Sequence, residues 1–261
     1  VAYLTLSGND IFSSQISYQN PQCVTFGAYA VVFDLDGYNF TLLTQDAVVY
    51  SKPTINQIKA VNVSSSGITA VITNSQESYG EVLLFDLNGV AISQWSSYNS
   101  GYPIACAFND DSTLLAVSTL NTNGALVVPY IRQFSLTKVD KGIEVADRAI
   151  YSTEDNVVFS SLFYVGDKLY CFTADSIYQV TDEEIKQINF DFAVVGRVVK
   201  VKNNLFITYS DGVSQMNKLA VINDSNTVLY SSSIGSDINA VCTNGSLYAI
   251  SVNKRVFVYN A

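Results

Sequence analysis

The sequence is 261 residues long, enough for one or two domains, and 48% of its residues are hydrophobic, which supplies a packed core and argues against disorder. Only 14% of residues are charged, so we expect neutral polar side chains and tyrosine to cover much of the surface. The net charge of −9 and the lack of a basic stripe argue against nucleic acid or an anionic lipid surface as a partner.

Short apolar runs, separated by turns of Gly, Asn and Asp, recur along the chain and predict hairpins of β-strands. The clearest copy spans residues 59–95, and the dipeptides Asp36-Gly37 and Asn88-Gly89 are strong hairpin-turn signals. A first type of hairpin is predicted, in chain order, at residues 23–33, 107–118, 162–172, 198–209 and 240–251. A second type is predicted at residues 81–95, 176–190 and 218–232. Within this second type, residues 181–187 (TDEEIKQ) are predicted as an acidic turn, because the segment is too short for a stable helix.

A repeat of about four dozen residues with only β content is typical of a β-propeller, whose blades are four-stranded sheets. We therefore predict an all-β fold, with residues 1–261 forming a single β-propeller domain of six blades, or of seven if one is incomplete. Residues 1–15 resemble a third and fourth strand, whereas the last copy offers only three strands. We expect the two ends to pair in one sheet and close the ring, which would leave no open sheet edge.

Several kinds of chemistry are missing from the sequence. The chain has no histidine, which removes Ser-His-Asp and Cys-His catalysis and histidine-based zinc sites. It has no glycine-rich loop of the kind that cradles phosphates. Residues 34–37 (DLDG) are similar to the start of a calcium loop but lack the bidentate glutamate, so a hairpin turn explains them better. We expect no cofactor and no metal.

The sequence also predicts no direct insertion into a membrane. The charge-free stretch nearest to membrane length, residues 112–131, contains polar residues throughout. The four cysteines, Cys23, Cys106, Cys171 and Cys242, form no C-x-x-C pair and are predicted to be buried free thiols. Three of them, Cys23, Cys106 and Cys242, are predicted to lie on innermost strands.

Two segments carry a resemblance to known proteins. Residues 107–118 (AFNDDSTLLAVS) are similar to the inner hairpin of WD40-type blades, although the Gly-His and Trp-Asp dipeptides are absent. Over nearly its full length, notably at residues 17–34 and 104–124, the chain resembles a family of uncharacterised WD40-like or quinoprotein-like propellers from Gram-positive bacteria. That resemblance implies an extracytoplasmic domain, anchored by an N-terminal segment not present in this chain, and it supplies no catalytic residue.

The candidate binding site comes from loops that vary in length between copies. The turn between second and third strands is extended at residues 75–80, 119–124 and 210–217, and the link at residues 96–103 is also long. In a propeller these connections share one face, which is often the binding face. Tyrosine and amide side chains there suit a protein, peptide or glycan partner. The candidate residues are Tyr79, Tyr98, Asn99, Tyr102, Asn121, Asn123, Gln215 and Met216.

The favoured function is therefore a non-catalytic binding or scaffold module of the bacterial cell envelope. The alternative is a carboxylate-dependent hydrolase or lyase with its site in the central channel. Its candidate acids are the neighbours at residues 110–111, 154–155 and 182–184, all of which are predicted to lie in turns.

Overall fold

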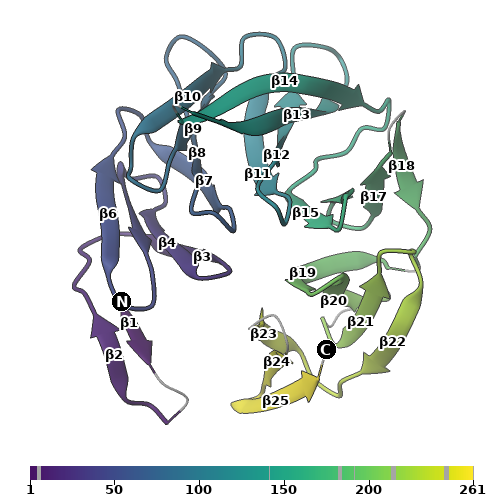
Figure 1. Ribbon diagram of the computed structural model, residues 1–261. Coiled ribbons are helices and arrows are strands. Elements are labelled where there is room, and N and C mark those ends of the chain that lie inside the picture. The colour runs from purple at the N-terminus through teal and green to yellow at the C-terminus, as the bar shows by residue number, and fades with distance from the viewer. Residues whose placement is uncertain are drawn as a thin grey trace. The chain divides into compact units, whose positions relative to one another are not determined.

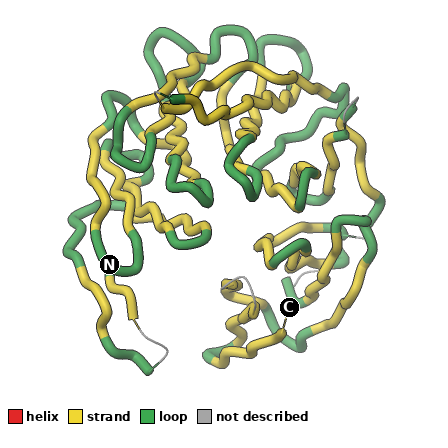
Figure 2. The backbone as a smooth tube through the Cα atoms, in the orientation of Figure 1, coloured by secondary structure: helices red, strands yellow, loops and turns green. Residues whose placement is uncertain are grey.

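The computed structural model describes residues 1–4, 7–140, 142–181, 184–190, 192–212, 216–243 and 247–260, and its regular elements are all β-strands (Figure 2). The chain divides into two compact units, Val1–Asn156 and Val157–Ala261. Within each unit, strands that are consecutive in the sequence pair antiparallel with one another, as Figure 1 shows. Over the described ranges we find no helix of a length and hydropathy that would span a bilayer.

Unit 1 begins with a two-stranded hairpin and continues with three four-stranded sheets. The hairpin consists of β1 (Ala2–Leu4) and β2 (Asp10–Ser13). The first sheet contains β3 (Pro21–Phe26), β4 (Tyr29–Asp34), β5 (Asn39–Leu43) and β6 (Val48–Pro53). The second contains β7 (Ile58–Val63), β8 (Thr69–Thr73), β9 (Glu81–Phe85) and β10 (Ala91–Ser96). The third contains β11 (Tyr102–Phe108), β12 (Leu114–Asn121), β13 (Val128–Val139) and β14 (Gly142–Ser152).

Unit 2 contains two further four-stranded sheets and one three-stranded sheet. The first is built from β15 (Ser161–Val165), β16 (Lys168–Phe172), β17 (Ile177–Val180) and β18 (Ile185–Ile188). The second is built from β19 (Val194–Val201), β20 (Asn204–Ser210), β21 (Lys218–Asn223) and β22 (Val228–Ser233). The last is built from β23 (Ile238–Thr243), β24 (Leu247–Val252) and β25 (Arg255–Asn260).

Each hydrophobic core lies between two consecutive sheets of the same unit. The second strand of a sheet is covered on both faces, so β8 reads TAVIT and is buried throughout. The core between the second and third sheets takes Ile72 and Leu84 from one side and Phe108 and Leu115 from the other. Complete burial of side chains of this size stabilises the fold by about 1.5–3 kcal/mol each. Face-to-face packing of consecutive sheets therefore supplies the main stabilising term.

Hairpin turns occur where the sequence predicts them. Gly89 has a φ of +74°, and its amide donates to the carbonyl of Asp86 at 3.0 Å. The Asp86 carboxylate accepts the amides of Asn88 and Val90, at 2.9 and 2.7 Å. The turn predicted at residues 181–187 is shorter than expected: a backbone hydrogen bond joins Thr181 to Glu184, and residues 185–187 belong to β18. Residues 182–183 lie outside the described residues.

The predicted fold class is confirmed. In the described residues, six sheets have three or more strands, and five of these have four. The strand pairs of all eight predicted hairpins occur. The two units are described separately, so the single-domain interpretation stays a prediction.

The pairing of the two chain ends also stays a prediction. β1 and β2 form their own hairpin in unit 1, and β25 is the edge strand of the three-stranded sheet in unit 2. Both elements carry exposed apolar side chains, among them Tyr3 and Leu4 on β1 and Val256 and Val258 on β25. A further strand would cover such an edge.

The prediction of buried thiols is correct for Cys106 and Cys171 and wrong for Cys23 and Cys242, which are exposed. All four are free. Cys23 lies on β3 and Cys242 on β23, the first strands of their sheets, as predicted. The valine next to each packs into a core, and successive side chains of a strand alternate between faces, so these two thiols point away from that core.

The ribbon formed by β13 and β14, at 12 and 11 residues, has no counterpart among the hairpins predicted from the sequence. On it Arg132 donates from Nε and Nη2 to the two carboxylate oxygens of Asp147, both at 2.8 Å. The guanidinium also lies 5.2 Å from the ring centroid of Trp95. Hydrogen bonding to Arg132 lowers the pKa of Asp147 below its ordinary value.

Candidate functional site

Three connections of unit 1 come together in one group, which we call the loop cluster: residues 74–80, 97–102 and 121–127. They contain the connections from β8 to β9, from β10 to β11 and from β12 to β13, together with Tyr102, the first residue of β11, and Asn121, the last residue of β12. Tyr79 links them, because its hydroxyl donates to Oδ1 of Asn123 at 2.7 Å. Its ring packs against that of Tyr102, with centroids 5.0 Å apart and an interplanar angle of 75°. One side chain therefore contacts both of the other connections.

Backbone hydrogen bonds hold the same connections in place. The amide of Tyr79 donates to the carbonyl of Ser97, and the amide of Ser97 donates to the carbonyl of Gly80, both at 2.9 Å. Ser97 is fully buried, and its hydroxyl donates to the carbonyl of Gly101 at 2.6 Å. The two connections are thus fixed to each other before any partner binds.

The asparagines of the loop cluster bond to one another as well. Nδ2 of Asn121 donates to the carbonyl of Asn99 at 3.1 Å, and Oδ1 of Asn121 accepts the amide of Asn123 at 3.0 Å. The structure therefore brings six of the eight candidate residues together in unit 1: Tyr79, Tyr98, Asn99, Tyr102, Asn121 and Asn123.

The remaining two candidates lie elsewhere in the chain. Gln215 falls outside the described residues. Met216 lies in unit 2 and is half-buried, and its carbonyl accepts the amide of Ile238 at 2.9 Å. A Cβ on Gly196 would come within 2.6 Å of the Met216 sulfur, so this side chain packs closely against β19.

Two tyrosines and one aliphatic residue of the loop cluster, and one aliphatic residue of a neighbouring connection, are exposed to solvent. Tyr98 and Tyr102 are 62% and 51% exposed. Sequence reasoning missed Ile55, which is 93% exposed, and Leu126, which is 62% exposed. The only signal for Ile55 was an apolar residue in a polar connection of four residues, TINQ. That connection adjoins the loop cluster, since the amide of Asn74 donates to the carbonyl of Gln57 at 3.1 Å.

Two buried hydroxyls lie beneath the loop cluster. Thr73 is the last residue of β8, and Thr119 lies near the end of β12. Each side chain is 1% exposed. In the part of the chain that the structure describes, neither Oγ1 has a hydrogen-bond partner. Gly80 covers this position closely, since a Cβ there would lie 2.8 Å from Pro103 and 2.9 Å from the Thr73 carbonyl oxygen.

The candidate acids serve turns in the structure. Asp111 accepts the amide and the hydroxyl of Thr113, and these bonds lower the pKa of its carboxyl group. Asp155 accepts the hydroxyl of Thr153 at 3.0 Å. Over the described ranges, no three His, Cys, Asp or Glu side chains gather as metal ligands would. Asp182 and Glu183 lie outside the described residues.

Up-and-down sheets of four antiparallel strands, with a core between consecutive sheets, define the β-propeller class of protein. Within that class, this chain belongs to a family of unknown function (DUF5711), whose model matches residues 1–261. Among curated proteins, no sequence matches this chain.

Solved structures share the fold. The structure of apo AztD from Citrobacter koseri is similar with a TM-score of 0.61 at 9% identity, and the match covers 94% of this chain and 70% of that one. A functionally unknown protein from Desulfotomaculum acetoxidans DSM 771 is similar with a TM-score of 0.60 at 13% identity, covering 95% of this chain and 84% of that one. At these identities the likeness extends to the fold alone.

Proposed function

We propose that this chain is a non-catalytic binding or scaffold module that engages a protein, peptide or glycan through the loop cluster. The observation that carries the proposal is the position of Tyr79, which is bonded to Asn123 and packed against the half-exposed ring of Tyr102. A surface aromatic side chain that is already held in place loses little entropy when a partner binds. Tyr98 lies nearby in the same loop cluster and adds a second exposed ring.

The chemistry of the loop cluster supports recognition by stacking and hydrogen bonding. Residues 74–80, 97–102 and 121–127 contain no Lys or Arg, and Glu77 is their only acid. Their polar groups are amides and hydroxyls, which bond equally well to a peptide backbone or to sugar hydroxyls. Tyrosine combines a rigid apolar ring with a hydrogen-bonding tip, and it is enriched in binding surfaces for that reason.

The alternative function, a carboxylate-dependent hydrolase or lyase, has less support. A general acid of that mechanism needs a raised pKa. Among the described residues, the carboxyl groups with a shifted pKa are Asp111, Asp147 and Asp211, and hydrogen bonds to Thr113, Arg132 and Lys218 lower the pKa in every case.

We also propose that the module works outside the cytoplasm, in the bacterial cell envelope, and that an N-terminal segment anchors it. The support is the resemblance carried by residues 17–34 and 104–124. Protease treatment of intact cells that express the natural protein tests this proposal. Digestion without lysis is the expected result, and protection until lysis would contradict it.

The binding proposal is tested with arrays of glycans and of envelope proteins and peptides. The Tyr98→Ala/Tyr102→Ala variant should lose about 2 kcal/mol of binding free energy, close to thirtyfold in Kd, as expected for a good anchor. Tyr230→Ala is the matched control, because Tyr230 is 45% exposed and lies on β22 in unit 2. It should bind like wild type.

Melting curves separate binding from folding in these variants. Tyr98→Ala should melt like wild type, whereas Tyr102→Ala loses its contact with Tyr79, worth about 0.5–1.5 kcal/mol. The proposal fails if the double variant binds as tightly as wild type, or if Tyr230→Ala loses binding to the same extent.

A further inference from the structure

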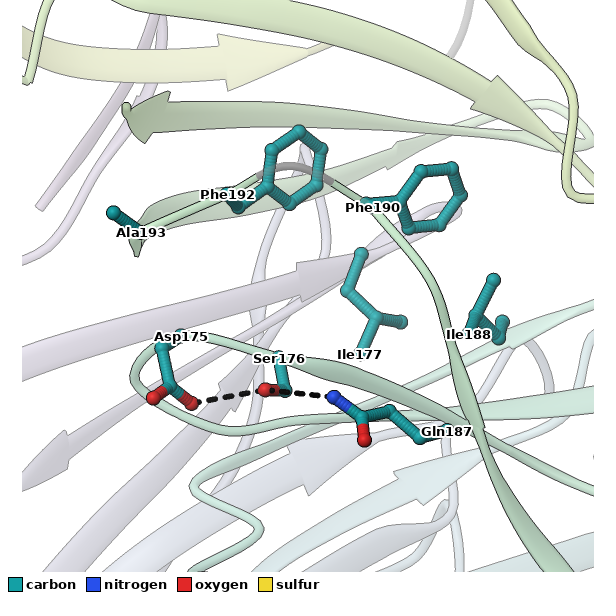
Figure 3. A pocket seen from close by; sticks show the side chains of 8 residues that line it. All are labelled: Asp175, Ser176, Ile177, Gln187, Ile188, Phe190, Phe192 and Ala193. Atoms are coloured by element: carbon teal, nitrogen blue, oxygen red, sulfur yellow. Dashed lines mark hydrogen bonds between the residues drawn. The ribbon is translucent and has the colours of Figure 1, made fainter. Parts of the chain in front are cut away.

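Unit 2 contains a pocket of about 230 Å³ that is separate from the loop cluster (Figure 3). It lies between the turn that joins β16 to β17 and the connection that joins β18 to β19. These are the same two kinds of connection that form the loop cluster in unit 1. The volume is far larger than one water molecule needs and suits a small molecule.

The polar side of the pocket is a chain of three side chains (Figure 3). Nε2 of Gln187 donates to Oγ of Ser176 at 3.2 Å, and Oγ of Ser176 donates to Oδ1 of Asp175 at 3.0 Å. The hydroxyl of Thr173 also donates to this Asp175 oxygen, at 3.0 Å. The hydroxyl protons at this side therefore already point to the carboxylate, which they hold in place.

The backbone donors beside the pocket are also engaged within the protein. The amides of Asp175 and Ser176 donate to the hydroxyl of Thr173, at 3.3 and 2.9 Å. The amide of Ala193 donates to the carbonyl of Ser210 at 2.9 Å. Apart from the second N–H of the Gln187 amide, what remains for a ligand is acceptor capacity, since a carboxylate has about four lone-pair positions and an amide oxygen has two. A complementary ligand must bring hydrogen-bond donors or positive charge.

The opposite side of the pocket is aromatic. The rings of Phe190 and Phe192 are stacked, with centroids 5.4 Å apart and an interplanar angle of 15°. The ring of Phe192 also packs against the ring of Tyr209, with centroids 4.3 Å apart, and this contact fixes the position of Phe192. Ile177 and Ile188 lie between the aromatic and polar sides (Figure 3). Aromatic rings attract a nearby cation through the negative potential of their faces.

We propose that this pocket binds a small organic cation that carries an ammonium group. The Asp175 carboxylate provides the opposite charge, and Phe190 and Phe192 provide apolar contact and cation–π attraction. The described residues that line the pocket include no Lys or Arg that would repel such a ligand. The site shares no residue with the loop cluster, so the inference goes beyond the proposed function and does not depend on it.

Calorimetric titration of the full chain with choline tests the proposal, with 3,3-dimethyl-1-butanol as the uncharged molecule of the same shape. Choline should bind about tenfold more tightly than the alcohol, and added salt should weaken its binding. Asp175→Asn keeps the acceptor Oδ1 but removes the charge, and it should weaken choline binding about tenfold. Phe190→Leu keeps an apolar side chain and should weaken binding about threefold.

Two control variants make the outcome decisive. Asp167→Asn removes the same charge from an exposed turn of the same sheet, and it should bind choline like wild type. The Tyr98→Ala/Tyr102→Ala variant should also bind choline normally, which separates this site from the loop cluster. Melting curves confirm that each variant is folded.

The proposal is overturned if the alcohol binds as tightly as choline, or if Asp175→Asn leaves the affinity unchanged. It is also overturned if neither molecule binds at millimolar concentration, or if methyl glucoside binds more tightly than both, which would indicate a site for a neutral sugar.

Discussion

Replacing Gly101 with alanine should destabilise unit 1 and distort the loop cluster. Gly101 lies in the connection between β10 and β11 and has a φ of +81°, in the left-handed region that favours glycine. A Cβ at this position would lie 2.0 Å from the carbonyl oxygen of Leu120 and 2.5 Å from the Cα of Asn121. Both atoms belong to the backbone of β12, so no side-chain rotation can relieve the overlap.

The size of the effect follows from these two features. Holding alanine in the left-handed region costs about 1–2 kcal/mol. Forcing an extra carbon into packed surroundings costs typically about 1–3 kcal/mol. The sum is about 2–5 kcal/mol, and a loss of about 3 kcal/mol would lower Tm by about 6–12 °C in a domain of this size.

Thermal unfolding followed by the fluorescence of Trp95 measures this directly, because Trp95 is the only tryptophan and lies on β10, close to the substitution. Gly124→Ala is the matched control in the same loop cluster. Its Cβ would meet Leu126 at 3.6 Å, an ordinary contact, and its φ lies outside the left-handed region. We expect a change of at most about 1 kcal/mol there. Equal melting temperatures for the two variants would refute the reasoning.

Three other measurements test burial, hydrogen bonding and charge. Burial raises the pKa of Cys106 to about 12 and encloses its thiol, so it should alkylate much more slowly than exposed Cys23, and equal labelling by mass spectrometry would contradict this. Thr73→Val should leave Tm unchanged or raise it, whereas Thr208→Val, which removes a bonded hydroxyl, should cost about 1–3 kcal/mol. The bonded arginine lowers the folded pKa of Asp147, so its stabilisation is present above the unfolded value of about 3.9 and is lost as pH falls through the folded pKa. Asp147→Asn should therefore melt earlier than wild type at pH 7, and the difference should shrink as the pH falls below about 3.9.

Strands and hairpin turns could be predicted because the residues that specify them are neighbours in the sequence. The pair Asn88-Gly89 shows this, since the turn needs the left-handed backbone that Gly89 adopts and the Asx hydrogen bonds that Asp86 provides. The loops of the loop cluster could also be predicted, because their length varies between copies of the repeat. Strands of a repeat must fit the sheets on either side, so connections such as residues 74–80 are where copies can differ.

Contacts between sheets could not be predicted, because they depend on which face a side chain occupies and on what covers that face. Cys23 and Cys106 occupy first strands of two sheets and have similar sequence surroundings, but only Cys106 faces a core. The exposure of Ile55 was missed for the same reason, since an apolar residue in a turn gives no sign of whether another element covers it. The pocket beside Asp175 depends on the stacking of Phe190 on Phe192, and both residues lie in the connection between β18 and β19, which has no recognisable sequence motif.

The two candidate sites use the same kinds of connection for opposite chemistry. In unit 1 these connections are long, carry Glu77 as their only charged residue and are hydrogen-bonded to one another, and they present exposed rings that can contact a large partner. In unit 2 the turn between β16 and β17 is short, so the aromatic rings of the next connection lie across from a carboxylate and enclose a small volume. The length and the composition of these connections thus distinguish the exposed loop cluster from the pocket. Because the two sites share no side chain, variants of one serve as folded, charge-matched or size-matched controls for the other.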